Sequence, residues 1–413
     1  MQNKNTLIRD FNVRQLLVNS CSFFLLGLIL FFMGNRYLRY FFPDSICSLS
    51  SFLGILFISL SAIFAKRKKS YKNTDILCYL FFLYNIVIVI NAFFESNFNL
   101  NMIWSNLREI TNYLSPFMIL FPFFKYQLRT ILYISILSCI LAVLFVVFQW
   151  KELITEPAII EMGFFNVHVV NRASVAATMV IPALLFLGLK ETPKWMKYLI
   201  IFSAFLGLLA ALLSGRRSSS FTILLMLLFM LSTYYKNFNI KILFYIAMGI
   251  VFFDLMGVHN VLHKFISFDF LLERITDNTR KGVESDLVAD FDTFSWLFGR
   301  GFWGTYYAPS SIDLIRRNMI ETGYLHMILK GGVFFLMLYC LILLKTAYEG
   351  FCKGKNSLSK LLGLYAFVHL ILLYPGGHIN FNLDYFILWM GVAYCNNTYF
   401  RNLQDVDVKK LIW

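Results

Sequence analysis

The stretch LIIFSAFLGLLAALLSGRRSSSFTILLMLLFMLSTYY, residues 199–235, places two adjacent arginines between two long apolar runs. Each run approaches the roughly 20 residues that a helix needs to cross the hydrocarbon core of a bilayer. A charged side chain at the bilayer centre costs about 2.5–3.5 kcal/mol on insertion scales. The stretch therefore predicts two spanning helices joined by a short turn, with Arg216 and Arg217 at a membrane surface.

The whole chain has the composition of a membrane protein. Of its 413 residues, 59% are hydrophobic and 15% are charged, whereas soluble domains are about 45–50% apolar and about 25% charged. The apolar runs are continuous, unlike the alternating segments of about ten residues in a transmembrane β-barrel. The first run lacks a small-x-small cleavage site, so it predicts a retained helix instead of a signal peptide. We expect an all-α polytopic membrane protein with one domain over residues 1–413.

Hydropathy predicts about twelve spans. One long outer loop over residues 258–320 is expected between the ninth span and the tenth. The fourth span carries Pro116 and Pro122, which favour a kinked or partly re-entrant segment. The predicted spans are 15–34, 47–65, 76–94, 111–124, 130–149, 173–189, 197–213, 218–234, 241–257, 321–344, 360–374 and 380–397.

Basic residues predict the orientation. If the amino terminus is cytoplasmic, every inner connection is basic, and the run KRKKSYK at Lys66–Lys72 is one of them. Because short cytoplasmic loops carry an excess of Lys and Arg, both termini are predicted to be cytoplasmic. The seven cysteines show no C-x-x-C spacing, so the sequence indicates neither a metal site nor a disulfide framework.

This orientation puts the arginine pair on the outer side, where two interpretations are open. The arginines can extend to lipid headgroups or pair with carboxylates of the long loop. They can instead hold a phosphate-bearing ligand, because a planar guanidinium binds phosphate oxygens in bidentate fashion. Ser214 and Ser218–Ser220 surround the pair, and the first amides of the next helix also favour anions.

A second motif, ETGYLHMILKGGVFF, begins at Glu321, at the predicted outer mouth of span ten. A carboxylate there can accept a proton from a hydroxyl, or it can simply be an acid that the helix dipole favours. On a helix Tyr324 shares a face with Glu321, whereas His326 points away. His326 is expected to be a hydrogen-bonded bundle residue, and Gly331 and Gly332 are expected to allow close helix packing.

A third motif, WLFGRGFWGTYY at residues 296–307, combines three glycines with six aromatic side chains. It predicts a constrained loop that is either an aromatic belt with turn glycines or a stacking platform for sugars. The G-x-G-x-x-G spacing matches a dinucleotide fingerprint, but no βαβ unit surrounds it, so we reject that match. The loop carries acids and bases together, and its basic residues include Arg280, Lys281, Arg300, Arg316 and Arg317.

Three features follow one another on the outer side: an arginine after span seven, a long outer loop with an arginine and a G-x-G turn, and a polar start of span ten. This order resembles the O-antigen polymerase and O-antigen ligase superfamily. The resemblance covers roughly Phe205 to Leu343. It implies a GT-C-like bundle in the bacterial inner membrane, whose arginines contact a lipid-linked pyrophosphate. The matching positions are Arg216 and Arg217 in GRRSS and Arg280 in the loop, with Arg274 as the weaker loop candidate.

The resemblance also implies the reaction. The donor is an undecaprenyl-pyrophosphate-linked glycan, the acceptor is a sugar hydroxyl on another lipid-linked repeat, and no metal, cofactor or nucleic acid is expected. Glu321 is the candidate base, His326 lies five residues further on, and Tyr324, Arg300 and Trp303 are candidate substrate contacts.

Ligases usually carry histidine at the position of Glu321, which favours a polymerase here. The alternatives are an O-antigen ligase that transfers glycan to lipid A core, and a transporter of lipid-linked oligosaccharides. Membrane lipid and a chain-length regulator protein are the candidate partners. The donor is already activated, so no nucleotide site is needed.

Overall fold

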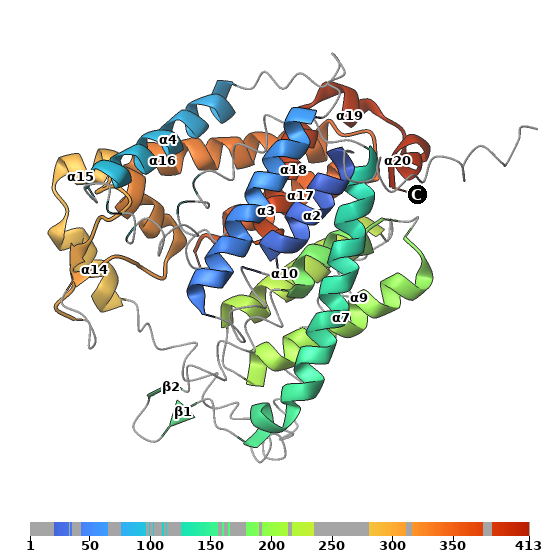
Figure 1. Ribbon diagram of the computed structural model, residues 1–413, viewed down its shortest axis with the longest axis horizontal. Helices are drawn as coiled ribbons and strands as arrows, with labels where there is room; N and C mark the ends of the chain where they lie inside the picture. The colour runs from blue at the N-terminus through green and yellow to red at the C-terminus, as the bar shows by residue number, and fades with distance from the viewer. Residues whose placement is uncertain are drawn as a thin grey trace, which may run out of the picture.

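The structure is a computed structural model of a mostly helical chain (Figure 1). It describes residues 20–32, 43–64, 76–95, 125–155, 179–189, 192–213, 217–234, 281–310, 316–374 and 382–412, together with strands 159–160 and 164–165 and a few single positions. The helices of the first half are α2 (Ser20–Phe32), α3 (Asp44–Phe64), α4 (Ile76–Glu95), α7 (Lys125–Thr155), α9 (Lys194–Leu213) and α10 (Arg217–Tyr234).

The second half contains shorter helices and one long one. They are α14 (Lys281–Asp290), α15 (Thr293–Phe298), α16 (Gly323–Ala347), the π-helix η6 (Tyr348–Cys352), α17 (Ser357–Leu372), α18 (Leu383–Asn396), α19 (Thr398–Asn402) and α20 (Asp405–Ile412). Two antiparallel strand pairs complete the described structure. They are β1 (Ile159–Ile160) with β2 (Phe164–Phe165), and β3 (Tyr306–Tyr307) with β4 (Arg316–Arg317).

Five of the described helical segments are long and apolar enough to cross a membrane. They lie at Asp44–Ser61, Ile76–Glu95, Ile131–Phe148, Lys194–Ala211 and Gly323–Cys352. The protein is therefore a helical membrane protein. The total of about twelve spans stays a prediction, because the ninth predicted span and most of the fourth lie outside the described residues.

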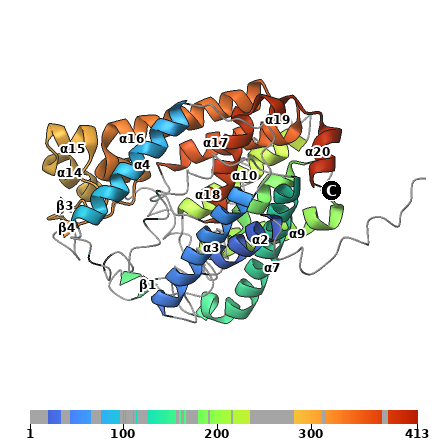
Figure 2. The same cartoon turned by 45° about the horizontal axis from the view of Figure 1, so that its top comes forward.

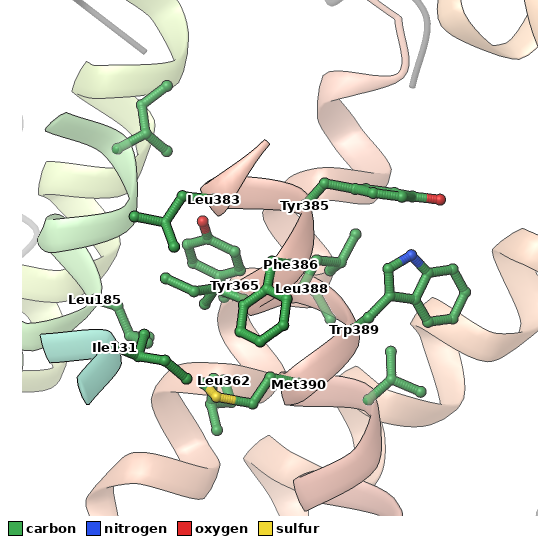
Figure 3. Close-up of a cluster of buried hydrophobic side chains, with 14 of the residues drawn as sticks. Ile131, Leu185, Leu362, Tyr365, Leu383, Tyr385, Phe386, Leu388, Trp389 and Met390 are labelled. Atoms are coloured by element: carbon green, nitrogen blue, oxygen red, sulfur yellow. The ribbon is translucent and has the colours of Figure 1, made fainter. Parts of the chain in front are cut away.

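The core of the bundle surrounds α18. Trp389 of α18 is fully buried, and its ring lies 5.5 Å from Phe81 of α4 and 6.1 Å from Tyr339 of α16. Figure 3 shows how Leu362 and Tyr365 of α17 cover another side of the same helix. A helix that is apolar on all sides is stable only inside a bundle, so α18 forms the centre around which the other helices pack.

Helix α16 is interrupted at Gly332, which corrects the prediction of one continuous span over 321–344. Gly332 has φ 73° and ψ −178°, outside the helical region, and a Cβ there would collide with the carbonyl oxygen of Leu297. The break divides α16 into a first limb, 323–331, and a second limb that starts at Val333. From Val333 to Cys352 there are about 20 residues, or roughly 30 Å of helix, which matches the hydrocarbon thickness of a bilayer.

The first limb belongs to a small unit, which we call the loop unit, made of residues 281–310 and 316–331. It has its own buried cluster, which includes Leu287, Phe291, Tyr306, Leu325 and Leu329 and is separate from the main core. Figure 2 shows α14, α15, β3 and β4 at one end of the molecule, where α4 and α16 meet them. The described part of the predicted long loop is thus a folded structure that sits on the ends of two apolar helices.

Candidate functional site

The structure describes the side chains of only some of the predicted site residues. Those described are Arg300, Trp303, Glu321, Tyr324 and His326. Arg216, Arg274 and Arg280 lie outside the described residues, and Arg217 is described only as the first residue of α10. The expected grouping of the arginines around a diphosphate therefore stays a prediction.

Glu321 lies at one edge of the loop unit, next to the β3–β4 pair. It is exposed, and the adjacent Thr322 hydroxyl donates a hydrogen bond to the Glu284 carboxylate of α14. Tyr306 of β3 is opposite Arg317 of β4. Burial raises the pKa of the Tyr306 phenol, the positive charge of Arg317 opposes this rise, and the negative charges of Asp286 and Glu321 add to it.

These residues define the candidate site, which we call the rim: Tyr306, Arg317 and Glu321. The Tyr306 hydroxyl is buried and has no hydrogen-bond partner among the described residues. Among the described residues, Arg316 and Arg317 form no ion pair, and Arg316 is exposed. A carboxylate, a guanidinium and a phenol close together provide a proton acceptor, an anion-binding group and a hydroxyl.

Tyr324 and His326 lie in different environments on the first limb of α16. The Tyr324 ring stacks on Tyr374 at 6.2 Å between centroids, and the adjacent Gly323 N–H donates to the Leu373 carbonyl at 2.9 Å. His326 is buried, and its backbone N–H donates to the Thr322 carbonyl. The exposed Glu321 and the half-buried Tyr324 are therefore accessible, while His326 belongs to the interior.

Arg300 holds the loop unit together. Its guanidinium pairs with the Asp290 carboxylate, donates to the Thr305 carbonyl at 2.8 Å and lies 4.6 Å from the Phe291 ring centroid. Its Nε donates to the Ser295 hydroxyl at 3.2 Å. These contacts give Arg300 a positioning role within the unit, and its predicted contact with substrate remains untested.

The glycine-rich turn is attached to both neighbouring helices. Lys330 is buried, and its ammonium donates to the Phe302 carbonyl at 2.8 Å and to the Gly304 carbonyl at 3.1 Å. The Trp303 indole donates to the Ala92 carbonyl of α4 at 3.0 Å. Lys330 also interacts with the charge of Glu95, at the end of α4.

Lys330 lies inside the predicted span 321–344, and no role was predicted for it from the sequence. The available signal was a lysine next to two glycines, combined with an acid that ends an earlier apolar run. In the described ranges, no group of three or more His, Cys, Asp or Glu residues lies close enough to hold a metal ion.

Comparison of the chain with protein-family models, with curated proteins and with solved structures finds no match in any of the three. The fold and the rim define the class of the protein: a helical membrane protein with a folded loop unit at the end of its bundle. Any more specific statement about its activity is a proposal.

Proposed function

We propose that this chain is a glycosyltransferase that joins lipid-linked oligosaccharide repeat units into O-antigen or a related surface polysaccharide. The donor is a glycan on undecaprenyl pyrophosphate, and the acceptor is a sugar hydroxyl of a second lipid-linked repeat. The reaction takes place at the outer face of the bacterial inner membrane, with both termini of the chain in the cytoplasm. It needs no metal, because the diphosphate leaving group is stabilised by arginines.

The observation that supports this proposal best is the rim at the end of α4 and α16. A lipid-linked substrate carries its diphosphate at the headgroup level and its glycan in water. A folded unit at the end of apolar helices has access to both regions. The unit presents Glu321 and Arg317 on one edge, and the order of arginine pair, loop and helix start is that of the superfamily that the sequence resembles.

The proposed chemistry is displacement at the anomeric carbon. When the bond from this carbon to the diphosphate breaks, negative charge develops on the leaving group. Arg216, Arg217 and Arg280 stabilise this charge, and loss of one such contact typically lowers the rate about 10²–10³-fold. The acceptor hydroxyl loses a proton as the new bond forms. The sequence predicts Glu321 as the base and Tyr324 as the residue that orients this hydroxyl.

The test uses a strain that lacks the gene. Purified full-length protein is given the lipid-linked repeats extracted from that strain, and a ladder of longer glycans is the expected product. Arg216→Ala, Arg280→Ala and Glu321→Gln should shorten the ladder, whereas Arg129→Ala, an exposed arginine of α7, is the matched control.

Three outcomes contradict the proposal. Normal ladders from all three variants, at normal protein levels, remove the assigned roles. Transfer of glycan onto lipid A core identifies a ligase. Movement of the repeats across the membrane without elongation identifies a transporter.

A further inference from the structure

A histidine, an aspartate and a tyrosine meet where α17 and α18 face each other. The Tyr365 hydroxyl donates to Asp384 Oδ1, and His369 Nε2 lies 3.2 Å from the same oxygen. Tyr365 and His369 are one helical turn apart, with ring centroids separated by 4.8 Å. Figure 3 shows the Tyr365 ring next to Leu383, the residue before Asp384.

The cluster is withdrawn from solvent. The side chains of His369 and Asp384 are 13% and 16% exposed, and Tyr365 is fully buried. An ionised carboxylate in such a place is costly unless it is paired and hydrogen-bonded. Ionisable groups inside a membrane bundle mark functional sites by default. Asp384 has two such partners, Tyr365 and His369. Because ionisable groups in such a place are usually functional, the cluster is a candidate for chemistry.

The cluster lies close to the elements that carry the predicted site. His369 is one turn before Leu373, whose carbonyl accepts from the N–H of Gly323 at the start of α16. Helix α10, which begins at Arg217 in the arginine motif, packs against α17. The helix that carries the histidine therefore packs against the helix of the arginine pair, and its end is bonded to the start of α16.

We infer that His369, in place of the Glu321 that the sequence predicts, is the proton acceptor of the glycosyl transfer, and that Asp384 and Tyr365 are positioning residues for it. This inference rests on the proposed function. As the acceptor oxygen bonds to the anomeric carbon of the donor, its proton passes to His369 Nδ1. The bond from the anomeric carbon to the diphosphate breaks, and its electron pair leaves with the lipid diphosphate. The imidazolium then releases the proton to water.

The geometry favours this assignment because a carboxylate on one ring nitrogen prepares the other for base chemistry. Asp384 accepts a hydrogen bond from Nε2–H, which selects the tautomer with a free lone pair on Nδ1 and stabilises the imidazolium that forms. Tyr365 holds the carboxylate in place by binding the same oxygen. Glu321, at the exposed rim, then orients the incoming acceptor.

The groups around the histidine come from three helices. Asp384 is on α18 and Tyr365 on α17, and Tyr339 of α16 and Tyr385 of α18 lie within electrostatic reach of the cluster.

The experiment measures initial rates of ladder formation by the full-length protein in nanodiscs, with the extracted lipid-linked repeats as substrate. His369→Gly should lower the rate about 10²–10⁴-fold, with partial recovery when imidazole is added. Asp384→Asn should lower it on the order of 10⁴-fold, as loss of the orienting carboxylate does in other histidine–carboxylate pairs. Phe367→Leu, at an exposed position of α17, is the matched control.

Two results overturn the inference. One is a His369→Gly protein that works within about threefold of the wild type, far from the loss expected for a general base. The other is an Asp384→Asn protein that works within about threefold of the wild type, since loss of the orienting carboxylate is expected to lower the rate on the order of 10⁴-fold. The second result uses a different variant, so it holds even if His369→Gly does not fold. A wild type that makes no ladder at all refutes the proposed function itself.

Discussion

The Lys330 ammonium lies 2.8 Å from the carbonyl oxygen of Phe302. This contact, with a second to the Gly304 carbonyl, joins the first limb of α16 to the turn that leads into β3. Because Lys330 is only 6% exposed, these carbonyls replace water around the charge. The attachment of the glycine-rich turn to the first limb of α16 thus depends strongly on one side chain.

Lys330→Met should destabilise the protein. The substitution keeps the length of the side chain but removes two charge-assisted hydrogen bonds, each worth about 1.5–3 kcal/mol. Lys353→Met is the control, because the exposed Lys353 forms a surface pair with Glu349 and lies over the Tyr348 ring, and such surface pairs contribute about 0.3–0.5 kcal/mol. Equal unfolding temperatures of the two variants in detergent would show that the Lys330 contacts stabilise the protein no more than the surface contacts of Lys353.

Gly332→Ala and Gly391→Ala should have opposite effects. Alanine at position 332 must adopt a positive φ and meets the Leu297 carbonyl, with a strain of about 1–2 kcal/mol from the backbone alone. Gly391 lies inside α18, where an added Cβ meets Leu362 at 3.4 Å. Alanine is favoured over glycine in a helix by about 1 kcal/mol, so this variant should be as stable as wild type or more so. Chemical denaturation of both variants makes the comparison, and a Gly332→Ala protein as stable as Gly391→Ala contradicts it.

Tyr306→Phe should reduce the loss of folding stability that the protein shows above about pH 10. The pKa of Tyr306 is raised in the folded state, chiefly by burial. The unfolded tyrosine loses its proton at about pH 10 while the folded one keeps it, so the stability from this group is complete below about pH 10 and is lost above it. Phenylalanine removes this loss, and it also removes a buried hydroxyl that lacks a partner among the described residues.

The measurement is the free energy of unfolding as a function of pH between about 9 and 11, around the ordinary tyrosine pKa. Tyr307→Phe is the matched control, because Tyr307 is the exposed neighbour on the same strand. If both variants have the same pH dependence, burial of Tyr306 is not the cause of the alkaline slope.

The pair Arg300 and Asp290 should show energetic coupling. Arg300→Met and Asp290→Asn each break an ion pair that is partly shielded from water, and the double variant loses little more than either single one. We expect a coupling energy of about 1–2 kcal/mol from a double-mutant cycle, within the range for hydrogen bonds to charged groups. A coupling near zero would indicate that Arg300 acts through its other contacts, to Ser295 and Thr305.

The helices that the sequence predicts best are those defined by long apolar runs. The predicted spans 76–94, 197–213 and 218–234 lie within a few residues of α4, α9 and α10. Hydropathy finds such helices because burial in lipid requires about 20 apolar residues whatever their neighbours are. Hydropathy does not indicate the break at Gly332. The apolar run continues on both sides of this glycine, and the break lies in its backbone conformation, which hydropathy does not detect.

The candidate site was predicted only in part. Glu321 could be found because a charge at the start of an apolar run stands out. The contact between His369 and Asp384 could not, because it joins two helices and neither residue has a motif around it. Helices α14 and α15 of the loop unit are short, so they depend on local signals such as the Asp292 carboxylate, which accepts from Ser295 N–H at the start of α15.

Two of the attachments of the loop unit to the bundle involve α16 and α4: Gly332 joins the unit to the second limb of α16, and Trp303 binds the backbone of α4 at Ala92. Helices tilt to match the thickness of the bilayer around them. When α4 and α16 tilt by different amounts, the two anchor points shift relative to each other and the rim rotates with them. Acyl-chain length in the surrounding lipid is thereby a mechanical input to the orientation of the rim that carries Glu321 and Arg317.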